Sequence, residues 1–245
     1  KAADLDDTDA MYNLAYCFFE GDGVPQNKPK AIQLLQQAVD LGHTGAMAIL
    51  ADCYEKGDGV SQDKSKTIQL YQQASDLGNA DAMFYLAVCY KTGDGVAQDK
   101  SKAIQLYQQA ADLGHTDAMV KLAICYQKGN GVAQDKSKAI QLYQEATDLG
   151  NTGAMVKLAV CYRTGDGVPQ DKSKAFELYQ QASDLGDTLA MLNLAYCYLK
   201  GECVAQDKTK AFQLNQQAYD LGDTRALFNL GTCYLKGHGV SQDKS

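Results

Sequence analysis

The sequence has no tryptophan, only three prolines and three histidines, and no long run of apolar residues. A membrane-spanning helix takes about 20 consecutive apolar residues, so we expect no membrane insertion. The three histidines, His43, His115 and His238, all fall in expected turns, and none stands beside a plausible nucleophile and acid. A formal net charge of −7 argues against nucleic acid as the partner.

The sequence instead repeats itself every 36 residues without an insertion. An Ala-Met pair marks each copy, at Ala10, Ala46, Ala82, Ala118, Ala154 and Ala190, and becomes Ala-Leu at Ala226. We therefore expect one repeat domain over 1–245, with 1–9 as the end of a preceding repeat, six full repeats at 10–45, 46–81, 82–117, 118–153, 154–189 and 190–225, and a partial repeat at 226–245. A fixed period of this length is the signature of a solenoid. The simplest reading of the two ends is a segment cut from a longer array.

Each copy predicts two antiparallel helices of roughly three turns. In the copy at 82–117, Met83, Leu86 and Tyr90 share one face of a helical period, and an apolar stripe ending at Leu113 marks the second helix. One copy offers too little apolar surface to offset the cost of ordering its backbone, so stability is shared between neighbours.

Glycines and polar residues mark the ends of these helices. We expect the Gly93 to Val96 segment to end the first helix, Asp99 to cap the second, Gly114 to follow it in a left-handed conformation, and Thr116 to cap the next first helix. Lys100 and Lys102 are expected to reach Asp94 or its neighbour, as surface pairs of small energetic weight.

These features resemble the Sel-one-like repeat family, a relative of the tetratricopeptide repeat. The matching positions in one copy are Ala82, Leu86, Tyr90, Gly93, Gly95, Val96, Asp99, Lys102, Ala103, Tyr107, Ala110 and Gly114. The chain departs from the family pattern at two positions. The residue after the core leucine is alanine in six copies and glycine only in the last, at Gly231. Leu106 stands where the family often has an aromatic residue. The resemblance implies an all-α fold, a right-handed α-solenoid of helix-turn-helix repeats, and a role as an adaptor or scaffold.

The differences between copies collect on one face of the first helix. Tyr12, Tyr16 and Phe19 follow the i, i+4, i+7 spacing of one helical face. In tetratricopeptide-like solenoids this face lines the concave groove, so we expect it to bind a protein or peptide partner. The predicted apolar anchors are Tyr12, Tyr16, Phe19, Phe84, Val88, Leu192, Tyr196, Leu199, Phe228 and Leu235. The predicted polar contacts are Asn13, Lys121, Lys157, Asn193 and Asn229.

Two alternatives to groove binding stay open. The varied side chains can be buried against the next helix, or can have drifted at positions without a function. A structural protein that stacks head to tail into fibres through its open solenoid ends is the alternative function, because such contacts do not close.

Seven of the eight cysteines occupy one position in each copy and are expected to point inward. Stacked equivalents lie about 10 Å apart, too far for a ladder of disulfides. Cys203 instead replaces a loop glycine, where it is either exposed or strained. Unpaired cysteines favour a reducing compartment such as the cytoplasm.

No metal, cofactor or catalytic site is expected. There is no CxxC motif, and the loop GxG lacks both a preceding strand and a third glycine. The acidic residues repeat from copy to copy, whereas an active site needs one unlike group of residues, so we expect no enzyme activity.

Overall fold

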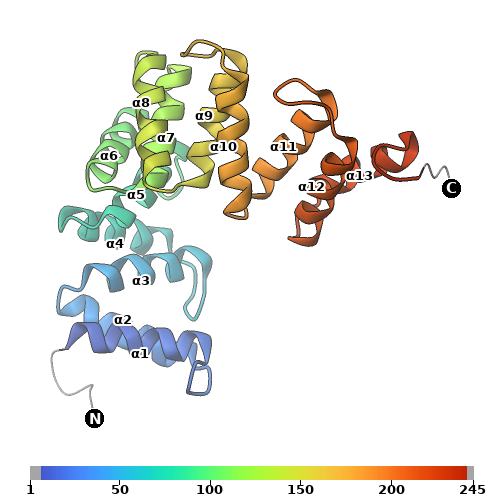
Figure 1. Ribbon diagram of the computed structural model, residues 1–245. Coiled ribbons are helices and arrows are strands. Elements are labelled where there is room, and N and C mark those ends of the chain that lie inside the picture. The colour runs from blue at the N-terminus through green and yellow to red at the C-terminus, as the bar shows by residue number, and fades with distance from the viewer. Residues whose placement is uncertain (1–6, 242–245) are drawn as a thin grey trace. The chain divides into compact units, whose positions relative to one another are not determined.

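The computed structural model describes residues 7–241, and in that range it consists of 13 helices joined by turns, with no strand (Figure 1). The helices are α1 (Thr8–Glu20), α2 (Lys28–Asp40), α3 (Thr44–Lys56), α4 (Lys64–Asp76), α5 (Ala80–Thr92), α6 (Lys100–Asp112), α7 (Thr116–Lys128), α8 (Lys136–Asp148), α9 (Thr152–Thr164), α10 (Lys172–Asp184), α11 (Thr188–Lys200), α12 (Lys208–Asp220) and α13 (Arg225–Lys236). The predicted all-α fold of helix-turn-helix repeats is confirmed.

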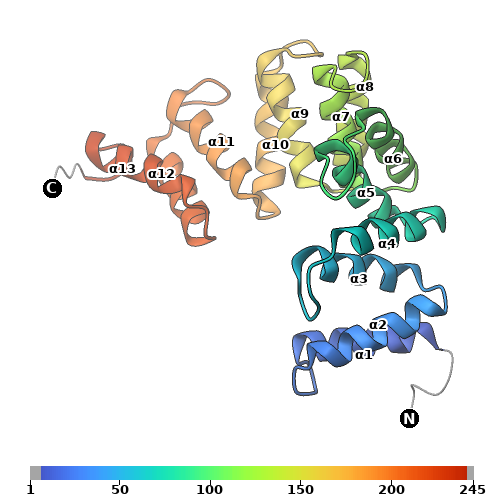
Figure 2. The same ribbon diagram turned by 180° about the vertical axis from the view of Figure 1, so that it is seen from behind.

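The chain forms two compact units. One comprises residues 1–118 with 130–132, and the other comprises residues 119–129 with 133–245. In both units a second helix packs on the first helix of its own hairpin and on the first helix of the next hairpin, as α2 does with α1 and α3, and α10 with α9 and α11. The view from behind in Figure 2 shows the same pairing. Each hairpin therefore buries two faces, as a repeat that cannot fold alone requires.

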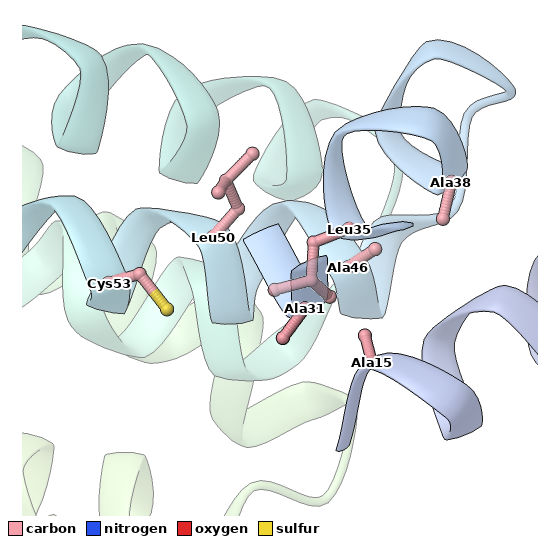
Figure 3. Packing of buried hydrophobic residues seen from close by; sticks show 7 residues of the cluster. All are labelled: Ala15, Ala31, Leu35, Ala38, Ala46, Leu50 and Cys53. Atoms are coloured by element: carbon pink, nitrogen blue, oxygen red, sulfur yellow. The ribbon is translucent and has the colours of Figure 1, made fainter. Parts of the chain in front are cut away.

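Small and aliphatic side chains fill the core of each hairpin. In the first unit Ala15, Ala31, Leu35, Ala38, Ala46, Leu50 and Cys53 form one buried cluster (Figure 3). Alanine lets two helix backbones approach closely, and Leu50 fills the remaining space with its side chain fully buried. Tyrosines of the second helices, Tyr71, Tyr107, Tyr143 and Tyr179, are the largest fully buried side chains of the described residues.

Recurring hydrogen bonds fix the loop inside each hairpin. Gly93 ends α5 with a left-handed φ of 82°, and Asp99 accepts a hydrogen bond from the backbone N–H of Lys102 at 2.9 Å, so both predicted end signals are confirmed. The Nε2 of Gln98 donates to the carbonyl of Lys91 at 2.7 Å, and the same glutamine bond recurs in six loops. This bond satisfies a carbonyl that the end of the first helix leaves without a partner.

Two predicted roles at the helix ends are wrong. Thr116 is the first residue of α7, and the capping atom belongs to His115, whose Nδ1 accepts from the N–H of Ala118 at 3.1 Å. An imidazole ring nitrogen reaches the same N–H that a capping hydroxyl would reach. Leu113 follows α6 and is 57% exposed, because the chain has already left the helical path that buries the apolar stripe.

The predicted lysine contacts are also wrong. Lys102 donates to the Oη of Tyr90 at 2.6 Å and lies over its ring. Asp94 instead pairs with Lys64 of the preceding copy, and the same pairing joins Lys28 to Asp58 at 2.7 Å. The start of a second helix thus faces the loop of the next hairpin, so these ion pairs link consecutive repeats.

Candidate functional site

The residues that vary between copies form what we call the first-helix face. It has four positions in each copy: Tyr12, Asn13, Tyr16, Phe19; Ala48, Ile49, Asp52, Glu55; Phe84, Tyr85, Val88, Lys91; Val120, Lys121, Ile124, Gln127; Val156, Lys157, Val160, Arg163; Leu192, Asn193, Tyr196, Leu199; and Phe228, Asn229, Thr232, Leu235. Each first helix presents its four residues along one side. The first three copies lie in the first unit, and the others in the second.

The predicted anchors differ in exposure. Tyr16 is 62% exposed, Tyr196 is 42% exposed, Phe228 is 81% exposed, and Leu235 is also exposed. The other six are half-buried: Tyr12, Phe19, Phe84, Val88, Leu192 and Leu199. Large apolar side chains thus remain in contact with water in both units.

Two half-buried rings pack on a histidine of the following turn. The Phe84 ring stacks on His115 with centroids 4.7 Å apart, and the Tyr12 ring stacks on His43 at 5.0 Å. Both histidines also cap the next first helix, and the Nε2 of His43 lies 3.0 Å from a carboxylate oxygen of Asp9. One face of each of these rings therefore belongs to the packing between repeats, as the packing alternative expects.

Buried tyrosines form the floor below the fourth position of the face. The Tyr71 hydroxyl donates to the Glu55 carboxylate at 3.3 Å, and the Tyr143 hydroxyl donates to the Gln127 side-chain oxygen at 3.2 Å. Burial raises the pKa of Tyr71, which keeps its hydroxyl neutral and able to donate. In the first and sixth copies the buried tyrosine is replaced by Leu35 and Asn215. The residues at the fourth position of the face in these two copies are Phe19 and Leu199.

The structure brings the anchors of the first unit together at two hollows. Tyr12, Tyr16 and Phe19 all line a pocket of about 190 Å³. Phe84 and Val88 line a second, wider hollow of about 510 Å³.

Two apolar residues of the face are not among the predicted anchors. Ile49 lines the first pocket and Tyr85 lines the second, and both are exposed. They occupy the second position of the face, that of Asn13. Only the polar residues at this position were predicted to contact a partner. An apolar residue at a position that is polar in most other copies indicates such a contact in the sequence alone.

The predicted polar contacts divide into two groups. Lys157 and Asn13 are exposed, and Lys121 is half-buried. The side-chain amide of Asn193 already donates to the Leu189 carbonyl at 2.8 Å, and that of Asn229 donates to Asn215 at 2.9 Å. The two amides of the second unit therefore have partners inside the protein.

The charged residues of the face differ between the units. The first unit carries Asp52, Glu55 and Lys91 on the face, whereas the charged residues of the face in the second unit are Lys121, Lys157 and Arg163. Two cations lie near the Tyr196 ring, the Arg163 guanidinium carbon 6.0 Å from its centroid and the Lys200 ammonium at 5.9 Å. The face thus has charges of both signs in the first unit and only positive charges among its Asp, Glu, Lys and Arg side chains in the second.

The cysteines are all free, and six of the seven periodic ones are buried. Burial raises the pKa of Cys53 to about 12, with the charges of Asp52 and Asp58 acting in the same direction. Burial likewise raises the pKa of Cys89 and of Cys161 to about 11. These thiols are neutral at physiological pH and act as small apolar side chains.

Within residues 7–241, no group of three or more His, Cys, Asp or Glu side chains is placed to hold a metal ion. No helix of the same residues combines the length and the hydropathy that crossing a membrane requires.

Comparison with known proteins assigns the repeat. The Sel1 repeat model matches seven consecutive segments, 8–43, 44–79, 80–115, 116–151, 152–187, 188–223 and 224–245. The segments follow one another without a gap, and together they cover the chain from residue 8 to its last residue. No curated protein matches the chain.

Solved structures show a similar arrangement of helices. A Sel1 repeat protein from Oxalobacter formigenes is 31% identical, with a TM-score of 0.84 over 88% of this chain and 89% of that one. A protective antigen of uropathogenic Escherichia coli with an SLR fold is 28% identical, with a TM-score of 0.83 over 97% of this chain. The match covers 51% of the antigen, so the chain spans about half its length. An immunity protein of Pseudomonas aeruginosa, 21% identical with a TM-score of 0.62, shares the fold alone.

Proposed function

This chain belongs to the Sel1 repeat family, and from that premise we propose that it is a scaffold whose first-helix face binds a peptide or a helix of a partner protein. Sel1 repeat proteins generally act as protein-interaction scaffolds, and the repeat is typically a non-catalytic fold. The use of this particular face is our proposal.

The observation that carries the proposal is the exposed aromatic surface of that face. Tyr16, Tyr196 and Phe228 remain exposed although neighbouring side chains of the same helices are buried. Tyrosine and phenylalanine that lose water on binding contribute strongly to protein interfaces. The residues also vary between copies of one chain whose core positions are nearly constant, as expected where each repeat contacts a different part of a ligand.

The charges support a partner with segments of different chemistry. The basic residues on the second unit complement an acidic or carboxylate-bearing segment, and the two carboxylates of the second copy, Asp52 and Glu55, complement a basic one. End-to-end stacking into fibres is not proposed, because nothing observed among the described residues favours it.

The test compares one variant on the face with a matched variant outside it. Ligands are first selected for the full chain from a random peptide array, and their dissociation constants are then measured for Tyr196→Asp and Leu185→Asp. Leu185 is a suitable control because it lies in the same unit, just after α10, and is 62% exposed. Both variants are expected to keep the helicity and melting temperature of the parent.

We expect Tyr196→Asp to lose binding by about tenfold or more, the range of an interface anchor, and Leu185→Asp to bind normally. The reverse pattern would place the binding surface on the exposed leucines that follow the second helices. If no selected peptide loses affinity for Tyr196→Asp or for Leu185→Asp, the scaffold proposal is contradicted for this unit.

A further inference from the structure

The pocket of about 190 Å³ in the first unit lies where one buried side chain of the repeat changes. Leu35 lines it, and the equivalent residues of the next four copies are the buried tyrosines Tyr71, Tyr107, Tyr143 and Tyr179. Leucine is shorter than tyrosine, so the space that the outer half of the ring takes up in those copies stays open in the first. A hollow also exists at the equivalent place of the next copy, but there Asp52, Glu55 and Lys56 stand in place of Tyr16, Phe19 and Glu20. The leucine floor, the aromatic wall and the free carboxylate are therefore combined only at the first of these two hollows.

The walls of the pocket are aromatic and aliphatic. The rings of Tyr12, Tyr16 and Phe19 come from α1, and Ile49 and Cys53 come from α3. Figure 3 shows Leu35 and Cys53 on the neighbouring helices α2 and α3. The raised pKa of the Cys53 thiol keeps that part of the wall uncharged. An apolar chain of several carbon atoms fits such walls.

The rim of the pocket is acidic. Glu20, Asp52 and Asp58 line it. Asp52 pairs with Lys56 at 2.8 Å, and Asp58 pairs with Lys28 at 2.7 Å. Glu20 makes no hydrogen bond or ion pair with the residues from 7 to 241, so the rim keeps one carboxylate without a counter-ion. Three aromatic rings beside an unneutralised carboxylate attract a cation.

We propose that this pocket binds the side chain of an arginine from a basic segment of the partner protein. The inference rests on the proposed function and deepens it by naming what the first unit recognises. The guanidinium lies against the tyrosine and phenylalanine rings and meets Glu20, and the methylene stem lies along Leu35 and Ile49.

Arginine suits these walls better than the other candidates. Its planar head is weakly hydrated and stacks on aromatic rings, whereas the lysine ammonium is compact and strongly hydrated. A purely apolar side chain would fill the pocket but would leave Glu20 partly desolvated and without a partner. The charge at the rim therefore separates arginine from an apolar anchor of similar length.

The experiment uses the full chain and three capped pentapeptides that differ only at the central residue: arginine, its neutral isostere citrulline, and norleucine. Methyl NMR signals of Leu35 and Ile49 report occupancy of the pocket directly. Leu35→Tyr fills the pocket with the residue that four other copies use. Because Phe19 offers the new hydroxyl no acceptor, a moderate loss of stability is expected, and circular dichroism checks that the variant is folded. Glu20→Gln removes the free charge at an exposed site and keeps the shape.

We expect the arginine peptide to shift both methyl signals in a saturable manner and citrulline to bind about five- to tenfold more weakly. Glu20→Gln should weaken the arginine peptide about two- to fivefold, and Leu35→Tyr should abolish its binding. The inference is overturned if norleucine or citrulline binds as well as arginine, if the arginine peptide leaves the signals unchanged, or if both variants bind it like the parent.

This result is separable from the test of the proposed function. Tyr196 belongs to the second unit, and its variant tests whether the face binds peptides at all. Peptide binding that depends on Tyr196, together with an inert pocket, would remove the arginine site and leave the scaffold proposal in place. Should Leu35→Tyr fail to fold, the comparison of arginine with citrulline and the Glu20→Gln variant still decide the question.

Discussion

The Sγ atom of Cys203 lies 3.0 Å from the Sγ atom of Cys197. Cys203 replaces the loop glycine of the other copies and is half-buried, while Cys197 is buried near the end of α11. Burial and the neighbouring thiol raise the pKa of Cys197 to about 12. The less buried Cys203 is therefore the thiol that reagents reach first.

Oxidised glutathione should convert this pair into a disulfide. The Cys203 thiolate attacks one glutathione sulfur and releases one glutathione thiol, and Cys197 then attacks the Cys203 sulfur and releases the second. The protein loses two hydrogen atoms, which mass spectrometry of the intact chain and of its tryptic peptides detects. Cys203→Gly restores the glycine of the other loops and should show no such loss. A glutathione adduct that persists on Cys203 would contradict the expected closure.

Two glycine substitutions should change stability in opposite directions. Gly231 lies inside α13, and a Cβ built there meets no atom within 4 Å, so Gly231→Ala should raise the free energy of unfolding by about 0.5–1 kcal/mol. Gly93 has a φ of 82°, so Gly93→Ala should lower the same quantity by about 1 kcal/mol. Urea unfolding followed by circular dichroism measures both. An increase for Gly93→Ala would show that the cap geometry does not control stability there, and a decrease for Gly231→Ala would contradict the helix-propensity argument at Gly231.

The repeat and its helices could be predicted because their signals are local. The capping aspartate, the left-handed glycine and the apolar spacing all act within a few residues, so one copy contains them. The capping histidine was missed because capping preferences rank serine, threonine, aspartate and asparagine first. The pairing of Lys64 with Asp94 joins two copies and depends on how hairpins stack, which one copy does not contain.

The varied face could be predicted by comparing copies, but the exposure of each residue could not. Phe84 is half-buried because His115, 31 residues further along, stacks on its ring. Asn229 donates to a residue of the preceding helix, Asn215, which is itself an exception to the buried tyrosines. Both contacts depend on packing between neighbouring helices and have no local sequence pattern.

The loop carboxylate Asp166 should make stability depend on pH. It accepts hydrogen bonds from Lys136 and Gln127, each at 2.7 Å, and these lower the pKa of its carboxyl. Because the folded pKa lies below the unfolded value of about 3.9, the stabilisation is complete above that value and is lost as the pH falls through the folded pKa. Asp166→Asn should therefore cost about 0.2–1 kcal/mol at pH 7, and the two proteins should converge near the folded pKa.

Thermal unfolding at several pH values, with and without added salt, checks this prediction. Salt should reduce the difference at pH 7, since the pair is partly exposed. A difference that stays constant from neutral to acidic pH would assign the effect of Asp166 to its neutral hydrogen bonding or packing.

The first-helix face and the buried residues beneath it should be energetically coupled. The first copy combines Phe19 with Leu35, whereas the second combines Glu55 with Tyr71, whose hydroxyl donates to the carboxylate. Tyr71→Leu should destabilise the protein by about 1–3 kcal/mol, because it leaves a gap beneath a charged side chain. Glu55→Phe should also destabilise it, because the buried hydroxyl loses its acceptor.

The double variant Glu55→Phe/Tyr71→Leu recreates the pair of the first copy and should recover part of the loss, with a coupling energy of about 0.5–3 kcal/mol. Unfolding free energies of the four proteins measure this coupling. The recreated pair should also deepen the hollow that residues of α3 and α5 already line, and NMR shifts of those residues would report whether the arginine peptide enters it. If the losses of the two single variants simply add in the double variant, the two positions are not coupled. The combination of Phe19 with Leu35 in the first copy would then have no energetic basis.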